Sequence, residues 1–110
     1  MRATFLGTGN YLAPGRYWNS FVLDGRTVAY SGDCRPCEGL DQLASATDVL
    51  VLECNGGHPP PKAHHDPDDV RDLRRRFPRP QFVLTHLGEG LDLTGLPGTF
   101  VPDDFDVLEL

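Results

Sequence analysis

Two strand-like segments of this chain each lead into a side chain that can bind a metal ion or transfer a proton. The apolar run at residues 82–84 is followed by His86, and the run at 27–31 is followed by Asp33. An unbroken apolar run of this length is typical of a short strand buried on both faces. Because ligands bind at the carboxyl ends of strands in sheets covered by helices, both side chains are candidate site residues.

Each candidate also has an ordinary structural interpretation. A histidine at a strand end can hydrogen-bond a neighbouring carbonyl group, and an aspartate after a glycine, as in Gly32-Asp33, commonly caps the next turn. Two further histidines, His64 and His65, lie just before a predicted helix. Taken alone, His86 therefore fits a metal or acid–base site and a structural role equally well, whereas for Asp33 the turn-capping role is favoured.

The elements that position these residues follow from local patterns. Residues 20–23 and 27–31 form strand-like runs around Asp24-Gly25-Arg26, and an Asp-Gly pair in that place predicts a hairpin. Residues 38–46 carry apolar side chains at helical spacing, which predicts a short helix. The apolar run at 49–52 then predicts another buried strand.

The next helix has the clearest boundaries. Asp66 occupies a predicted N-cap, Pro67 the first helical position, and the arginines at 74–76 the last turn before Pro78. This arrangement indicates a solvated helix end rather than a nucleic-acid site. The apolar stripe expected to pack on the sheet consists of Val70, Leu73 and Phe77.

Both ends of the chain are predicted to be extended. A first strand at residues 3–7 ends in the turn cluster at 7–10, which lacks the helix and lysine of a phosphate-binding loop. A plain turn is the better interpretation of that cluster. The tail at residues 106–110 has a strand-like pattern.

Length and composition predict one domain covering residues 1–110. The net charge of −6 argues against a broad electrostatic interface with nucleic acid, so a nucleic-acid partner is predicted to be unlikely. No apolar run is long enough to span a bilayer, and the start of the chain has no apolar signal region, so we expect a cytoplasmic protein.

Three cysteines, Cys34, Cys37 and Cys54, cannot all pair within one chain, and in a reducing compartment we expect thiols. The spacing of Cys34 and Cys37 is that of a redox or zinc pair. Zinc sites of the thiolate type usually need two such pairs, and only one further cysteine is present. A role for the thiols is therefore the least favoured interpretation.

Several segments carry a resemblance to a known family, in matching order along the chain. They are Phe5-Leu-Gly-Thr-Gly, Thr27-Val-Ala-Tyr-Ser-Gly-Asp-Cys-Arg-Pro-Cys, Asp48-Val-Leu-Val-Leu-Glu, His64-His-Asp-Pro and Val83-Leu-Thr-His-Leu-Gly. Together they resemble the metallo-β-lactamase-fold superfamily, nearest to its phosphodiesterase and ribonuclease Z branch. The resemblance implies a sandwich of two sheets between helices, with one or two metal ions, usually zinc, that activate water for hydrolysis.

The resemblance also implies roles for individual residues. Asp33 corresponds to a carboxylate that bridges two metal ions, His86 to the last histidine ligand, and His64 to a histidine near the metals or substrate. We therefore expect Asp33, His64 and His86 as metal ligands, and Asp33 and His64 as catalytic residues. Asp33 and His86 are predicted to lie close together at the ends of neighbouring strands. His65 or Cys34 could add a ligand.

The family's His-x-His-x-Asp-His motif has no counterpart in this sequence. The expected fold is therefore a shortened α/β (α+β) half-sandwich, a mixed β-sheet with two main helices. Because a half-sandwich leaves one apolar sheet face bare, we also expect a homodimer.

Three functions remain open. One is a hydrolase of phosphoester-type or small-molecule substrates that uses zinc or another divalent metal. The second is a non-catalytic structural or binding module that keeps the fold without the dinuclear site, and the third is a thiol-based protein.

Overall fold

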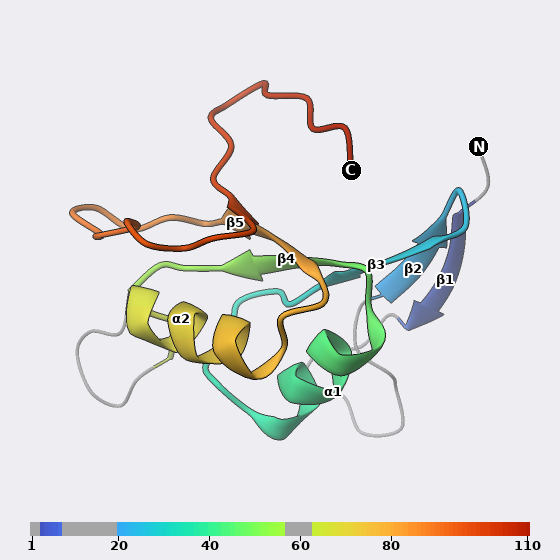
Figure 1. Cartoon of the computed structure of the whole chain (residues 1–110), viewed down its shortest axis with the longest axis horizontal. Coiled ribbons are helices and arrows are strands. Elements are labelled where there is room, and N and C mark those ends of the chain that lie inside the picture. Colours follow the sequence, from blue (N-terminus) through green and yellow to red (C-terminus); the bar gives the residue numbers. More distant parts are fainter. Residues whose placement is uncertain (1–2, 8–19, 57–62) are drawn as a thin grey trace.

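The structure, a computed structural model, describes residues 3–7, 20–56 and 63–110, with side chains described from Leu23 onward. It contains one mixed sheet with the strand order β1-β2-β3-β4-β5-β6, and two helices (Figure 1). The elements are β1 (Ala3–Gly7), β2 (Ser20–Leu23), β3 (Arg26–Tyr30), α1 (Glu38–Ala46), β4 (Val49–Glu53), α2 (Pro67–Arg76), β5 (Gln81–Thr85) and β6 (Thr99–Phe100). The predicted mixed sheet with two main helices is confirmed. Beyond Gly7, the predicted first turn lies outside the described residues.

The first three strands form an antiparallel meander, and β3 to β6 run parallel. The predicted hairpin between β2 and β3 is confirmed. Asp24 and Gly25 both have positive φ angles, 47° and 80°, as a two-residue turn of the type I′ class requires. Because Arg26 pairs with Leu23 directly across this turn, β3 begins at Arg26 and ends at Tyr30, one residue earlier than predicted.

Both helices cover the same face of the sheet (Figure 1). The connections from β3 to β4 and from β4 to β5 advance in one direction across the sheet. Because such crossovers are almost always right-handed, successive helices must fall on one side. No helix in the described segments has the length and apolar character that crossing a membrane requires.

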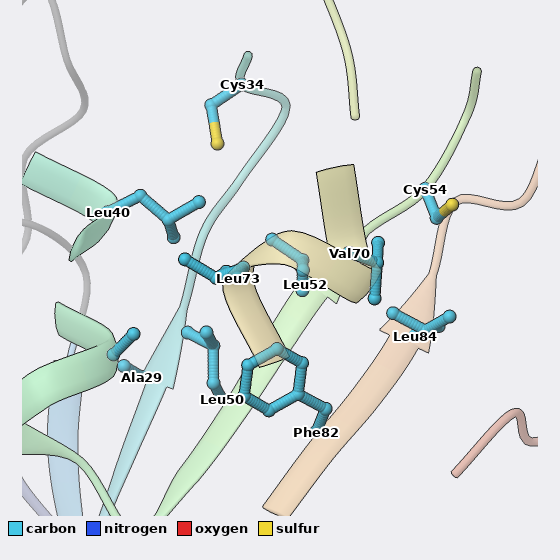
Figure 2. Packing of buried hydrophobic residues seen from close by; sticks show 11 residues of the cluster. Ala29, Cys34, Leu40, Leu50, Leu52, Cys54, Val70, Leu73, Phe82 and Leu84 are labelled. Carbon is cyan, nitrogen blue, oxygen red and sulfur yellow. The ribbon is translucent and has the colours of Figure 1, made fainter. Parts of the chain in front are cut away.

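The core lies between this helical layer and the sheet (Figure 2). Alternate residues of β3, β4 and β5 point to the helices, as the two-residue period of a strand dictates. All residues of this hydrophobic core are less than 4% exposed. They are Ala29, Cys34, Leu40, Ala44, Leu50, Leu52, Cys54, Val70, Leu73, Phe82 and Leu84.

Helix α2 begins as predicted. The Asp66 carboxylate accepts the backbone N–H of Asp69, and the Asp69 carboxylate accepts the backbone N–H of Asp66, which makes a reciprocal capping box. Val70 and Leu73 are buried, whereas Phe77 caps the carboxyl end and is only half-buried. The predicted stripe is thus fully buried at two of its three positions.

The arginines of α2 are more than a solvated helix end. Arg71 donates to the carbonyl oxygens of Asp92 and Thr94, and Arg74 donates from Nε to that of Pro97 at 3.0 Å. These bonds tie the connection between β5 and β6 to the helix. Arg75 alone fits the solvated interpretation well, because its side chain is 75% exposed.

The sheet face away from the helices is less well covered. Strand register places Tyr30 beside Val51, Val51 beside Val83, and Val83 beside Phe100 on this face. Val83 is buried, but Tyr30 and Phe100 are each 39% exposed. The predicted bare face is therefore partly covered within the chain.

The prediction of a strand-like tail at residues 106–110 is wrong. The last strand is β6, and the tail forms no ladder with any described strand. A turn closed by the backbone N–H of Asp106 and the carbonyl of Asp103 precedes it, and Phe105 and Val107 are 101% and 86% exposed. A strand needs a neighbour for its backbone groups, and an apolar alternation alone does not supply one.

Candidate metal centre

Three parallel strands end at one edge of the sheet with groups that can bind a metal. Asp33 follows β3, Glu53 is the last residue of β4, and His86 follows β5 directly. Since β3, β4 and β5 are parallel neighbours, their carboxyl ends meet at this edge. The sheet therefore gathers side chains that are more than 50 residues apart in the sequence.

Asp33 and His86 form a close pair. The Asp33 Oδ1 atom lies 2.9 Å from Nδ1 of His86, and their side chains are 61% and 43% exposed. The predicted proximity is confirmed. The prediction that they end neighbouring strands is wrong, because β4 lies between β3 and β5. The connecting loops, rather than adjacent strands, bring the two side chains together.

The backbone at His86 is constrained. Its φ angle is 49°, in the left-handed region that residues with a Cβ atom rarely adopt. A Cβ atom on the nearby Gly88 would lie 1.9 Å from the carbonyl oxygen of Asn55, so this position requires glycine. Such constraint is concentrated at functional sites in proteins, where the surrounding structure holds a residue in an unfavourable conformation.

Glu53 is the central group of the site. Its carboxylate is 0% exposed and accepts backbone N–H groups from His65 at 2.9 Å, Asn55 at 2.9 Å and Cys34 at 3.4 Å. Burial raises the pKa of Glu53, but hydrogen bonds from His65 and Asn55 outweigh that effect and hold it below its ordinary value. The carboxylate is thus a buried anion that links the loops after β3 and β4.

His64 and His86 complete the cluster around Glu53. The His64 Nδ1 atom lies 3.4 Å from Oε1 of Glu53, yet it is buried without a hydrogen bond to any of the described residues. The two imidazole rings meet edge to face, with centroids 5.5 Å apart. Ligand atoms of Glu53, His64 and His86 all lie within 4.8 Å of one another. Three ligand atoms this close together could hold one metal ion.

His65, in contrast, has a structural role. Its side chain is 1% exposed, and its Nδ1 atom lies 2.7 Å from the carbonyl oxygen of Cys34, to which a protonated Nδ1 donates. Because the backbone N–H of His65 also binds Glu53, this residue fixes the loop that presents His64. Of the two adjacent histidines, His64 faces the site.

Glu53 was missing from the sequence-based set of site residues. The signal that could have identified it was present, because an acidic residue after four apolar ones ends the middle strand of three. A glutamate at a strand end is common on protein surfaces, however. Only the strand order shows that this one lies between Asp33 and His86 and is buried.

Burial lowers the reactivity of two of the three cysteines. Cys34 and Cys54 are buried. Desolvation, with the negative charge of Glu53 nearby, raises the pKa of Cys34 to about 12 and that of Cys54 to about 11. Because the thiolate is the reactive form, both thiols are poor nucleophiles at neutral pH. Cys37 precedes α1 as its N-cap residue and is half-buried.

Two known proteins are similar in sequence to part of this chain. Ribonuclease Z of Methanosarcina mazei is 35% identical over 68 residues, which represent 57% of this chain and 22% of that protein. Ribonuclease Z of Bacillus licheniformis is 32% identical with the same coverage. This chain therefore spans about a fifth of the length of these relatives. No protein-family model matches it.

Two solved structures share the fold. Human tRNase Z, short form, superposes with a TM-score of 0.61 and 21% identity over 83% of this chain and 36% of that protein. The metallo-β-lactamase fold protein YhfI from Bacillus subtilis gives a TM-score of 0.55 and 22% identity over 79% of this chain and 36% of that protein. This chain accordingly has a metallo-β-lactamase-type fold over the part that these structures share, and it is similar in sequence to part of ribonuclease Z.

Proposed function

We propose that this chain is a metal-dependent hydrolase of phosphoester-type bonds. The observation that carries the proposal is the convergence of Glu53, His64 and His86 at the ends of the parallel strands, with Asp33 beside His86. The sequence relation to two proteins named ribonuclease Z supports a phosphodiester as the bond that is cut.

The residues present fit a divalent cation. His64 contributes a buried imidazole nitrogen that has no hydrogen-bond partner among residues 23–56 and 63–110, and Glu53 contributes a buried carboxylate. Two imidazoles with one carboxylate are a common ligand set of catalytic zinc, with the fourth position open. His64, His86 and either Glu53 or Asp33 would hold the ion. When bound, zinc or another divalent metal lowers the pKa of water and polarises a phosphoryl oxygen.

Two side chains, Asp33 and His64, contribute through where they are held relative to the cluster. Asp33 is accessible at 61% exposure and holds the proton on Nδ1 of His86, which fixes the orientation of that ring. His64 is 27% exposed and lies at the boundary between the buried carboxylate and solvent. We propose His64 as a catalytic residue, because it combines solvent access with a fixed contact to the cluster, and Asp33 as a residue that acts through His86.

RNA is the proposed substrate class. The sequence-based prediction that nucleic acid is an unlikely partner is not supported, because the relatives are named as a ribonuclease and a tRNase. That prediction rested on the net charge of the whole chain, −6. A net charge does not describe a local site, where a bound cation would itself attract a phosphate group.

The test of the function is turnover by the full 110-residue chain. With Zn²⁺ or Mn²⁺ we expect hydrolysis of bis-p-nitrophenyl phosphate and of a short RNA. EDTA should reduce the rate to the background value, and added metal should restore it. Asp104→Asn, a change at an exposed carboxylate in the tail, should retain the rate. Protein that binds metal but cleaves neither substrate would contradict the proposal.

One observation favours a second candidate, a non-catalytic binding module. The His-x-His-x-Asp-His motif is absent from this sequence, so ligands for a second metal ion are not supplied from it. A single-ion site can bind an anionic ligand without cleaving it. Retention of RNA on the metal-loaded protein, without cleavage, would favour this candidate.

We also propose that the chain forms a homodimer through the sheet face away from the helices. Tyr30 and Phe100 present exposed aromatic surface there, each at 39%. Sedimentation is expected to give twice 12.1 kDa, and Phe100→Asp should shift the protein to the monomer. Gln42→Asp, on the exposed side of α1, is the matched control. A wild-type monomer at micromolar concentration would disprove the dimer.

A further inference from the structure

Two carboxylates lie beside the imidazoles of the candidate metal centre, and their surroundings differ. Asp33 is 61% exposed and contacts Nδ1 of His86. Glu53 is 0% exposed and lies 3.4 Å from Nδ1 of His64. A bridging role for Asp33, as the family resemblance implies, requires two metal ions. These different surroundings indicate which of the two carboxylates would bind the metal ion.

Glu53 has the surroundings of a metal ligand. It is a buried anion, and within residues 23–56 and 63–110 no lysine or arginine forms an ion pair with it; the ionisable side chains beside it are the imidazoles of His64 at 3.4 Å and His65 at 3.5 Å. A buried charge without a counter-charge is unfavourable unless it coordinates a metal or is otherwise paired. Backbone N–H bonds from His65 and Asn55 already orient the carboxylate. Carboxylates that bind a metal are typically held in this way by hydrogen bonds from neighbouring groups.

His64 complements Glu53. Its Nδ1 atom is buried, lies 3.4 Å from Oε1 of Glu53 and makes no hydrogen bond within the part of the chain that the structure describes. Buried polar atoms nearly always have a partner, so each exception calls for an explanation. A cation that accepts the lone pair of His64 and faces the charge of Glu53 would satisfy both groups at once.

His86 is set up to bind through its other nitrogen. With Nδ1 engaged by Asp33, the lone pair of a neutral ring is on Nε2. A carboxylate behind a metal-bound histidine is a recurrent arrangement that fixes the ring and its tautomer. The cluster of mutually close ligand atoms contains His86 but not Asp33.

We propose that Glu53, His64 and His86 hold a single divalent cation, and that Asp33 is a positioning residue for His86 rather than a metal ligand. This inference rests on the metal-binding part of the proposed function. Three protein ligands leave one tetrahedral position for water or an anionic substrate group. The site thus differs from a dinuclear one in both its ligand set and its stoichiometry.

The test measures the affinity of the full chain for Co²⁺ by visible absorption and by calorimetry. We expect one ion per chain. Glu53→Gln and His64→Ala should each weaken binding by more than about 100-fold, whereas Asp33→Asn should cost about 10 to 100-fold, the usual effect of a residue behind a ligand. Asp104→Asn should leave the affinity unchanged. In ¹⁵N NMR spectra with Zn²⁺, His86 should bind through Nε2 and keep its proton on Nδ1.

If Glu53→Gln fails to fold, His64→Ala still tests the assignment. The His64 side chain accepts none of the hydrogen bonds that hold its loop to Glu53, so its removal should leave the fold intact. A loss with Asp33→Asn as large as that with Glu53→Gln, unchanged affinity with His64→Ala, or two ions per chain would each overturn the assignment. Binding as proposed without hydrolysis would refute the proposed function alone. Hydrolysis that survives His64→Ala at unchanged affinity would refute this inference alone.

Discussion

Replacing Phe82 with alanine is expected to lower the free energy of unfolding by about 3 to 5 kcal/mol. Phe82 is 0% exposed and is the second residue of β5, where it faces the helical layer (Figure 2). The guanidinium of Arg74 stacks over its ring, with 5.1 Å from Cζ to the centroid. The substitution removes the largest apolar side chain of the core, leaves a cavity and ends this cation–π contact.

The measurement is equilibrium unfolding in urea with EDTA present, followed by far-ultraviolet circular dichroism. Phe105→Ala is the matched control, because Phe105 is 101% exposed and its loss should change stability by less than about 0.5 kcal/mol. For a small domain with a total stability of about 5 to 15 kcal/mol, the Phe82 variant should unfold at much lower urea. Equal midpoints for the two variants would show that Phe82 is not a core residue.

Replacing Glu53 with leucine is expected to destabilise the metal-free protein by about 3 kcal/mol or more. The carboxylate accepts the backbone N–H groups of Cys34, Asn55 and His65, and each buried donor left without a partner costs about 1 to 3 kcal/mol. Leucine is apolar and of similar size, so the loss should come from these donors rather than from a cavity. Relief of the buried charge reduces the net effect.

Glu53→Gln separates hydrogen bonding from charge. The glutamine side chain keeps one oxygen that can accept bonds from the loop but loses the negative charge, so it should be more stable than the leucine variant. Hydrogen exchange of the amides at residues 34, 55 and 65 should become faster with leucine and change less with glutamine. A leucine variant as stable as the wild type would show that Glu53 is not the group that holds these loops.

Features set by neighbouring residues were readable from the sequence. The Asp24-Gly25 turn and the capping box at Asp66 depend on backbone conformations and hydrogen bonds within three residues, so their side chains alone predict them. The buried strands β4 and β5 were equally clear from their apolar runs. The carboxyl ends of those strands are where Glu53 and His86 of the candidate site lie.

The membership of the candidate site was decided by the tertiary structure. Insertion of β4 between β3 and β5 makes Glu53 the buried centre, and loop hydrogen bonds turn His64 toward it while His65 packs against Cys34. The tail at 106–110 has an extended pattern without a partner strand. These outcomes depend on contacts between residues far apart in the chain. A sequence pattern determines which residues are apolar, charged or able to cap, whereas strand order and burial determine which of them meet.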